Sequence, residues 1–213
     1  MNQTVDILIP TYNRRDLLEQ CLQSLLTQSY QNFKVYIYDD GGNDDSYLIA
    51  KEFSEKGMDI LFVKGAENNG VAYARNMLLT MGHSDYCMWQ DSDDIAHNRR
   101  VEKMLGAIID QKVDVVFSDM FFFKHPAPYR NTHTVHSVDI KKYVDRNGLY
   151  NNMNFATAIF KRSIGRLRFD TNLRRREDVK WLEQLIKKGT KFGYVQIPLY
   201  YCRRHDGRLT TKK

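Results

Sequence analysis

Short apolar runs alternate with helical stripes along the first half of this 213-residue chain, and no other feature limits its fold as strongly. Residues 5–10 form an apolar run that ends at a proline, as a buried strand does, and leucines at helical spacing follow it. The cycle returns with strand-like runs at residues 33–38, 59–63, 86–89 and 113–117. This alternation predicts a single α/β domain with a mainly parallel central sheet and helices on both faces.

Local signals predict where several elements begin and end. Asn13 is placed to cap the first helix. Residues 155–160 predict a strand, and residues 177–188 predict a helix that stops at a glycine. A late strand over residues 192–197 is expected to break at Pro198.

The stretch from residue 124 to residue 136 predicts a loop, because it holds two of the four prolines and three of the six histidines. The spacing of His125, His133 and His136 fits no helix face. We therefore interpret these histidines as loop residues and not as a metal cluster.

Bulk composition is that of an ordinary globular domain, with 42% hydrophobic and 27% charged residues. The formal charge of +6 favours acidic partners such as phosphates. Cys21, Cys87 and Cys202 are widely spaced and predict reduced core thiols, which favours the cytoplasm. No leader pattern and no apolar run near ~20 residues is seen, so we expect any membrane contact to be peripheral, at the inner face.

Carboxylates follow two of the predicted strands, at Asp39-Asp40 and at Asp91-Ser92-Asp93-Asp94. Ligands of an open parallel sheet bind at the carboxyl ends of its strands. Three carboxylates within four residues repel one another unless a cation lies between them, and Mg²⁺ or Mn²⁺ takes oxygen ligands and bridges to phosphates. We expect Asp91 and Asp93 to address one ligand, whereas Asp94 is expected to cap the next helix.

Seven segments, in order and at suitable spacing, resemble the motifs of glycosyltransferase family 2. They are residues 7–14, 22–30, 39–41, 69–76, 90–94, 177–178 and 200–205. The chain departs from that pattern at Gly42, where serine is usual, and at His97-Asn98, where proline is common. The resemblance implies a GT-A-type fold and inverting transfer of a sugar from a nucleoside diphosphate sugar, a UDP-sugar above all, with Mn²⁺ or Mg²⁺ as cofactor.

The same resemblance implies which residues form the site. It divides one domain into a nucleotide-sugar-binding half, residues 1–120, and an acceptor-binding and catalytic half, residues 121–213. The implied donor-binding residues are Pro10, Thr11, Tyr12, Arg14, Asp39, Asp40, Arg75, Asp91 and Ser92. The implied metal ligands are Asp93, Asp91 and His205, and the implied catalytic pair is Asp178 as base with Glu177 in support.

Several of these roles have a plainer alternative. Arg75 could reach the base or the diphosphate, or it could be a solvated charge on a helix. His205 could complete the metal or diphosphate site, or it could be a surface histidine in a basic tail. Glu177 and Asp178 could do no more than favour a helix N-terminus, where acids are stabilised by the dipole.

Two other function classes remain to be weighed. A nucleotidyltransferase of related fold would carry a glycine-rich, arginine-containing loop after its first strand, where this chain has Thr11-Tyr12-Asn13-Arg14. A non-catalytic nucleotide-sugar or nucleic-acid binding module is allowed by the charge, but no interleaved basic and aromatic motif is present. The expected partners are therefore a nucleoside diphosphate sugar and a glycan, lipid-linked or other hydroxyl acceptor, with nucleic acid not expected.

Overall fold

The computed structural model describes residues 2–124, 133–135 and 154–205. The chain alternates strands and helices through its first half, as the sequence predicts. The strands of this half are β1 (Val5–Thr11), β2 (Phe33–Asp39), β3 (Ile60–Lys64), β4 (Tyr86–Trp89) and β5 (Ile95–Ala96). Its helices are α1 (Arg15–Leu26), α2 (Ser46–Glu55), α3 (Val71–Thr80) and α4 (Arg100–Asp110).

The second half adds strands to the same sheet and one long helix. Its strands are β6 (Val115–Lys124), β7 (His133–Val135), β8 (Ile159–Lys161) and β9 (Phe192–Arg204). The helices are α5 (Glu177–Lys187) and the 3₁₀ turns η2 (Phe155–Thr157) and η3 (Arg162–Arg166). The described residues contain no helix that is long and apolar enough to cross a membrane.

A single sheet runs through the molecule in the order β3-β2-β1-β4-β8-β6-β9-β5, with β7 on the outer part of β6. Strands β3, β2, β1 and β4 are parallel, and so are β6 and β9, whereas β8 runs antiparallel between β4 and β6. The predicted α/β fold with a mainly parallel sheet is confirmed. Its parallel first half brings the carboxyl ends of β2, β1 and β4 to one edge of the sheet.

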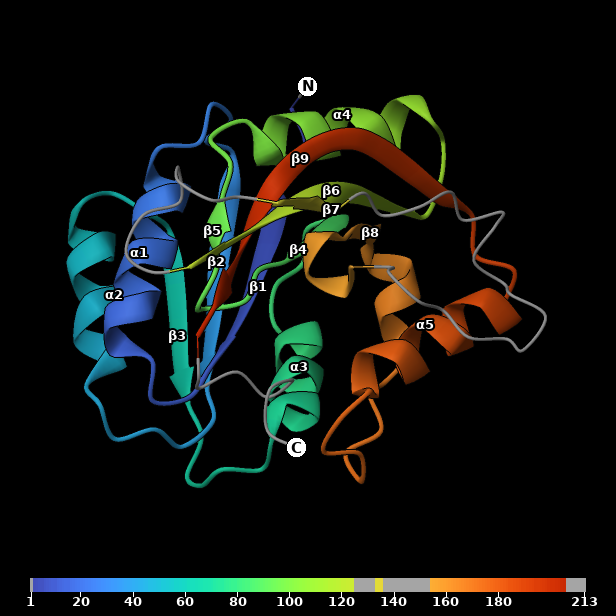
Figure 1. Cartoon of the computed structure of the whole chain (residues 1–213). Helices are drawn as coiled ribbons and strands as arrows, with labels where there is room; N and C mark the ends of the chain where they lie inside the picture. The colour runs from blue at the N-terminus through green and yellow to red at the C-terminus, as the bar shows by residue number, and fades with distance from the viewer. Residues whose placement is uncertain (1, 125–132, 136–153, 206–213) are drawn as a thin grey trace.

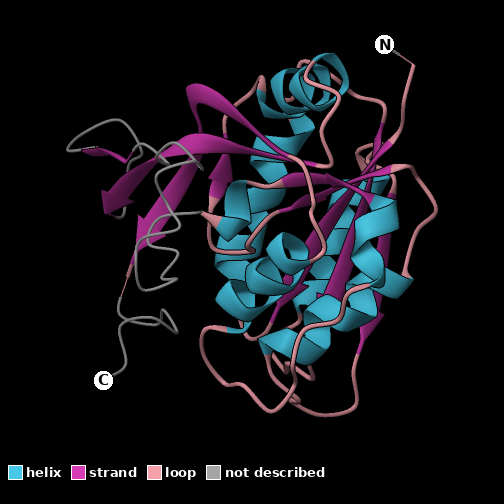
Figure 2. Cartoon of the chain, turned by 90° about the vertical axis from the view of Figure 1, so that its right-hand side faces the viewer, coloured by secondary structure: helices cyan, strands magenta, loops and turns pink. Residues whose placement is uncertain are grey.

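Helices cover both faces of the sheet (Figures 1 and 2). Side chains of β1 alternate between two cores, because successive residues of a strand face opposite sides. Val5, Ile7 and Ile9 pack with α1, α2 and α4, whereas Leu8 packs with α3 and α5. Burial on both faces explains why β1 is mainly apolar instead of alternating, and its one charged residue, Asp6, is buried and paired with Arg162.

The structure corrects two predicted strand boundaries. The late strand does not end before Pro198, because β9 continues to Arg204. Pairing with β6 shifts register at Asp119, which lies opposite Pro198, so an irregularity accommodates the residue that cannot donate to the ladder. The strand predicted over residues 155–160 is a 3₁₀ turn followed by the short strand β8.

The prediction that Asn13 caps the first helix is wrong. Helix α1 has Arg14 at its N-cap position, and the Arg14 side chain makes no capping hydrogen bond. The Asn13 side chain accepts instead from the Asn43 amide at 2.8 Å, while Asp44 accepts from the Arg15 amide at 2.6 Å. These two bonds tie together the loops that follow β1 and β2.

The loop predicted between residues 124 and 136 is interrupted by β7, which pairs antiparallel with β6. His133 opens this strand. His125 and His136 lie outside the described residues, so the interpretation of the three histidines as loop residues stays a prediction for them.

Candidate functional site

Three of the predicted donor-binding residues meet where neighbouring strands end. Thr11 and Asp39 are register partners at the ends of β1 and β2, and the Asp40 amide donates to the Thr11 carbonyl at 2.9 Å. Asp91 follows β4, which pairs with the other side of β1. The structure therefore gathers at one edge the residues that are separated by about eighty positions in the sequence.

The two carboxylates after β2 shape the adjoining turns. Asp39 accepts from the Gly42 amide at 3.0 Å, and Asp40 accepts from the amides of Asn69 and Gly70 at 3.1 and 2.6 Å. Both carboxyl groups are buried, and burial raises the pKa of each. Asp40 thus fixes the turn that leads into α3. The second carboxylate oxygen of Asp39 makes no hydrogen bond within the described residues.

Gly41 makes this turn possible. Its φ is +76°, and a Cβ placed there would lie 2.5 Å from the backbone carbonyl carbon of Glu67. A residue with a side chain would meet both strain and a clash at this point. The Asp-Asp-Gly sequence after β2 therefore has a backbone reason as well as a chemical one.

The residues at the end of β1 line the same edge. Thr11 is 4% exposed, and its Oγ1 has no hydrogen-bond partner among the described residues. Pro10 lies in β1 opposite Tyr38 of β2. Tyr12, by contrast, exposes 43% of its surface. A bound heterocycle could supply a hydrogen-bond partner to the buried Thr11 hydroxyl and stack on the exposed Tyr12 ring.

Asp91, Asp93 and Asp94 form a compact acidic cluster. Each offers an oxygen within 4.8 Å of the others. The carboxylate of Asp93 contacts the Arg14 guanidinium and lies 2.9 Å from His205 Nε2. The structure thus brings together the two carboxylates and the histidine that were predicted as metal ligands, with Arg14 beside them.

The pKa values of the three acids are shifted in different directions. Burial raises the pKa of Asp91, and the Arg75 guanidinium only partly opposes this. Burial also raises the pKa of Asp94 well above its ordinary value. At Asp93 burial acts in the same direction, but Arg14 and His205 together outweigh it and lower the pKa. Asp93 is therefore the acid in the cluster that most firmly holds a negative charge.

The prediction that Asp94 caps α4 is wrong. That helix begins at Arg100, and the Asp94 carboxylate instead accepts from the Arg203 amide at 2.7 Å. The hydroxyl of Tyr200, also on β9, accepts from the Asp91 amide at 3.1 Å. Asp94 thus anchors the loop of residues 91–94 to strand β9, and Ser92 in the same loop is buried.

Two buried arginines support this loop, and the sequence does not single them out as support. Arg203 donates from Nε to the Asp93 carbonyl at 2.9 Å. Arg100 donates to Gln90 Oε1 at 2.5 Å and to the Trp89 carbonyl at 2.7 Å, and burial lowers its pKa to about 10. Arg203 lies in the segment 200–205, which resembles a family motif. The sequence around Arg100 does not distinguish it from an ordinary charged residue near a helix start.

Arg75 joins the acidic cluster to the start of α5. It is 6% exposed, so the alternative of a solvated helix charge is wrong. Its Nη1 lies 2.6 Å from Glu177 Oε1, and its Nη2 lies 3.6 Å from Asp91 Oδ1. Glu177 is correspondingly buried, which leaves Asp178 as the more accessible acid of the pair.

Asp178 lies in the first turn of α5, whose N-cap residue Arg176 has the left-handed conformation. Its Oδ1 accepts from the Val179 amide at 2.8 Å. Its neighbour Glu177 shares the Arg75 guanidinium with Asp91, so the start of α5 lies beside the acidic cluster. The first turn of α5, which carries Asp178, is thus tied to the acidic cluster of the first half through Arg75.

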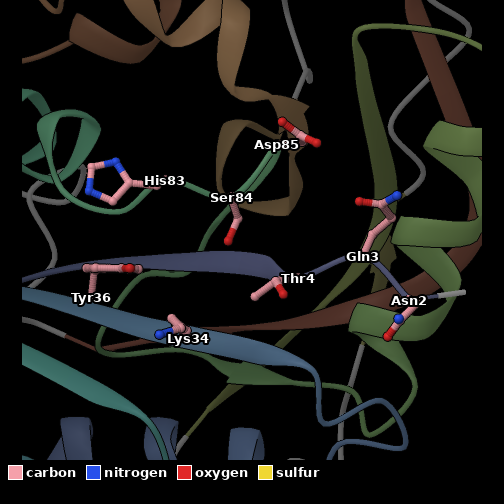
Figure 3. Close-up of a pocket in the computed structure, with 8 residues that line it drawn as sticks. All are labelled: Asn2, Gln3, Thr4, Lys34, Tyr36, His83, Ser84 and Asp85. Carbon is pink, nitrogen blue, oxygen red and sulfur yellow. The ribbon is translucent and has the colours of Figure 1, made fainter.

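A pocket at the other edge of the sheet is separate from this site (Figure 3). It lies at the amino ends of β1, β2 and β4, and none of the predicted site residues lines it. Its lining residues are Asn2, Gln3, Thr4, Lys34, Tyr36, His83, Ser84 and Asp85.

Comparison with known proteins identifies relatives and structural neighbours of this chain. The chain is 27% identical over 99% of its length to glycosyltransferase GlyA of Streptococcus pneumoniae, and it spans 32% of that relative. It resembles the crystal structure of S. aureus TarS in complex with UDP, with a TM-score of 0.77 at 18% identity, over 94% of this chain and 60% of that one.

A second structural neighbour is the mannosyltransferase PcManGT from Pyrobaculum calidifontis in complex with GDP-Man and Mn²⁺. The TM-score is 0.70 at 18% identity, over 96% of this chain and 57% of that one. Likenesses at this identity concern the fold, and they confirm the predicted GT-A-type architecture. The model of the family described as Glycosyl transferase family 2 matches residues 6–169, well over half of the chain, and the protein belongs to that family.

Proposed function

We propose that the protein transfers a sugar from a UDP-sugar to an acceptor hydroxyl, with inversion at the anomeric carbon and with the help of a divalent metal ion. The observation that carries the proposal is the convergence of Asp39, Asp91 and Asp93 at the carboxyl ends of β2 and β4, on either side of β1, with the start of α5 tied to Asp91 through Arg75. Structural neighbours in complex with UDP, with UDP-GlcNAc and with GDP-Man support a nucleotide-sugar donor.

The nucleoside is assigned to the edge formed by β1 and β2. Asp39 has an oxygen free to accept a hydrogen bond, and the imide N–H of uracil is a donor. The buried Thr11 hydroxyl would gain the partner that it lacks, and the Tyr12 ring can cover the base. Arg14, which already lies beside Asp93, is assigned to the diphosphate, since guanidinium groups pair well with phosphate oxygens.

The acidic cluster fits a hard divalent cation. Asp91 and Asp93 supply carboxylate oxygens of the kind that Mn²⁺ and Mg²⁺ prefer, and His205 Nε2 lies beside Asp93. Asp94 is already used by β9, so we assign the ligands to the other two acids and to the histidine. When bound, the ion offsets negative charge on the leaving diphosphate.

Transfer itself is assigned to Asp178. In a single displacement the acceptor oxygen bonds to the anomeric carbon, the bond from that carbon to the diphosphate breaks, and the hydroxyl proton passes to the Asp178 carboxylate. One displacement inverts the configuration at this carbon. We therefore assign residues 1–120 to the donor and residues 121–213 to the acceptor and the base.

The proposed acceptor is a glycan, a lipid-linked glycan or another compound with a free hydroxyl. A cytoplasmic location stays a prediction, and so does a peripheral membrane contact. The three cysteines are free and buried, as the prediction of reduced core thiols requires. Nucleotidyl transfer from UTP is the second function to exclude, and it differs in releasing pyrophosphate where the proposed reaction releases UDP.

The function is tested by a screen of UDP-, GDP- and dTDP-sugars with Mn²⁺. A donor that binds the folded protein raises its melting temperature in step with its affinity. We expect a UDP-sugar to give the largest rise and to release UDP over time. Pyrophosphate release from UTP, with no nucleoside diphosphate released from any sugar donor, would favour nucleotidyl transfer instead.

Base preference is expected to depend on Asp39. Calorimetry should show UDP binding about ten- to a hundredfold more tightly than CDP, because cytosine lacks the imide N–H and would leave a buried acceptor unpaired, at ~1–3 kcal/mol. Asp39→Ala should remove the preference. Asp39→Asn, whose amide can donate to the cytosine ring nitrogen, should narrow or reverse it.

The matched control for this experiment is Asp59→Ala, at an exposed acid that pairs with Lys34 on the surface. We expect this variant to keep the full preference for UDP. Equal affinities of the unmodified protein for UDP and CDP would refute the assignment of Asp39.

A further inference from the structure

The contacts of Arg75 join three separate parts of the chain. The residue belongs to α3, in the donor half. Its guanidinium lies 2.6 Å from Glu177 at the start of α5 and 3.6 Å from Asp91 after β4. With 6% of its surface exposed, this cation is held by two carboxylates and is screened little by solvent.

Two aromatic rings pack against the Arg75 guanidinium and restrict its orientation. Its central carbon lies 4.6 Å from the ring centroid of Phe155 and 5.6 Å from that of Phe169. The two rings pack edge to face at 5.6 Å. A planar cation held between carboxylates and rings has few other orientations open to it, so the position of Arg75 is well defined.

The neighbouring residue makes a second link between the same parts of the chain. The Asn76 side chain donates to the Phe169 carbonyl at 2.9 Å and accepts from the Phe169 amide at 2.8 Å. Helix α3 is therefore fixed to the second half at two adjacent points. Only the link through Arg75 also contacts an acid of the donor site.

We propose that Arg75 is a positioning residue that holds Glu177, and with it the first turn of α5, against Asp91 of the donor site. This inference rests on the proposed function. Asp178 is the next residue after Glu177, so the same contact sets where the assigned base lies relative to the anomeric carbon. Arg75 then acts on Asp178 through Glu177. The Glu177 oxygen that bonds Arg75 is not free to bind the sugar acceptor.

A displacement of about 1 Å at a reacting group can cost on the order of 10²-fold in rate, and binding of a distant part of the substrate is affected less. Loss of Arg75 should accordingly lower kcat and leave the nucleotide in place. A residue that contacted the diphosphate directly would give the opposite result, a large rise in the donor dissociation constant.

The test measures UDP release into water from a panel of UDP-glucose, UDP-galactose, UDP-GlcNAc and UDP-GalNAc with Mn²⁺, together with UDP affinity by calorimetry. We expect Arg75→Ala to lower kcat about 10²-fold with the UDP dissociation constant within about threefold of the parent. Arg75→Lys should recover part of the loss, and so should millimolar guanidine added to Arg75→Ala.

Coupling between the two residues is tested by a double-mutant cycle. Glu177→Ala should resemble Arg75→Ala, and the double variant should be little worse than either, because both remove one contact. Glu177→Gln keeps an oxygen that can accept a hydrogen bond from Arg75, so this variant should lose less of its kcat than Glu177→Ala. Asn76→Ala is the matched control: it weakens the other link to the second half, so it should lower the melting temperature but keep kcat within about threefold.

Three results would overturn the inference. The first is a tenfold or larger rise in the UDP dissociation constant of Arg75→Ala or Arg75→Lys with kcat unchanged. The second is independent, additive losses in the double variant, and the third is an equal loss of kcat in Asn76→Ala. If Arg75→Ala does not fold, Arg75→Lys and Glu177→Gln decide the matter by the same criteria. If the unmodified protein releases UDP from no donor, the proposed function fails and takes this inference with it.

Discussion

Asp93→Asn is expected to remove most of the transferase activity, by about 10²-fold or more, while leaving the fold intact. Asp93 is the acid of the cluster whose pKa is lowered, so it presents a full negative charge to a cation. The amide that replaces it has nearly the same shape but no charge, and it would weaken the hold on an ion that offsets charge on the leaving diphosphate. The measurement is UDP release at a series of Mn²⁺ and Mg²⁺ concentrations.

Excess EDTA should abolish the activity of the unmodified protein, and added Mn²⁺ or Mg²⁺ should restore it. Asp110→Asn, at an exposed acid where α4 ends, is the charge-matched control and should behave like the parent. The melting temperature of Asp93→Asn should stay near that of the parent. Full activity in EDTA would contradict the metal assignment.

Strand positions in the first half could be predicted because burial on both faces leaves a simple record in the sequence. β1 and β2 are mainly apolar, and polar residues of the site stand at the end of each strand and directly after it. Ligands gather where parallel strands end, so the place of Asp39 and Asp91 followed from the element order. Nothing more than local pattern was needed for this part.

Long-range contacts explain what the sequence could not predict. Asp94 looks like a helix cap because aspartate before a helix usually is one. Its partner, the Arg203 amide, lies 109 residues away and becomes visible only when β9 pairs beside the loop. Pro198 likewise breaks a strand in local terms, but the irregularity opposite it in β6 accommodates it.

Arg75 shows the same limit in the candidate site. Whether Arg75 lies on the surface or in the interior could not be decided from the local sequence of α3, which places two polar residues together within a mainly apolar helix. The aromatic residues that enclose it come from residues 155 and 169, and its ion-pair partner is 102 residues away. The resemblance to a family indicated that Arg75 belongs to the site, but only the fold shows which groups it contacts.

Asp178→Asn is expected to leave UDP affinity unchanged and to cut turnover by about 10²-fold or more. An acceptor hydroxyl is a poor nucleophile and must lose its proton as the new bond forms, and a carboxylate within hydrogen-bond reach supplies 10²–10⁴-fold by taking it. Asparagine keeps the size and the oxygen that accepts from the Val179 amide, but it cannot take a proton. The measurement is kcat with the identified acceptor, set beside calorimetry with UDP.

A different outcome would follow if Asp178 only favoured the N-terminus of α5. Asp178→Asn would then cost up to about 1 kcal/mol of stability and leave turnover near normal. Glu183→Gln, at an acid farther along the same helix that pairs with Lys180, controls for loss of charge from α5 and should keep full turnover. Glu177→Gln should lose less turnover than Asp178→Asn, because Glu177 binds Arg75 and is not the assigned base, and glutamine can still accept from Arg75. Turnover of Asp178→Asn within threefold of the parent would show that Asp178 is not the base, and Glu177 would be the next residue to test.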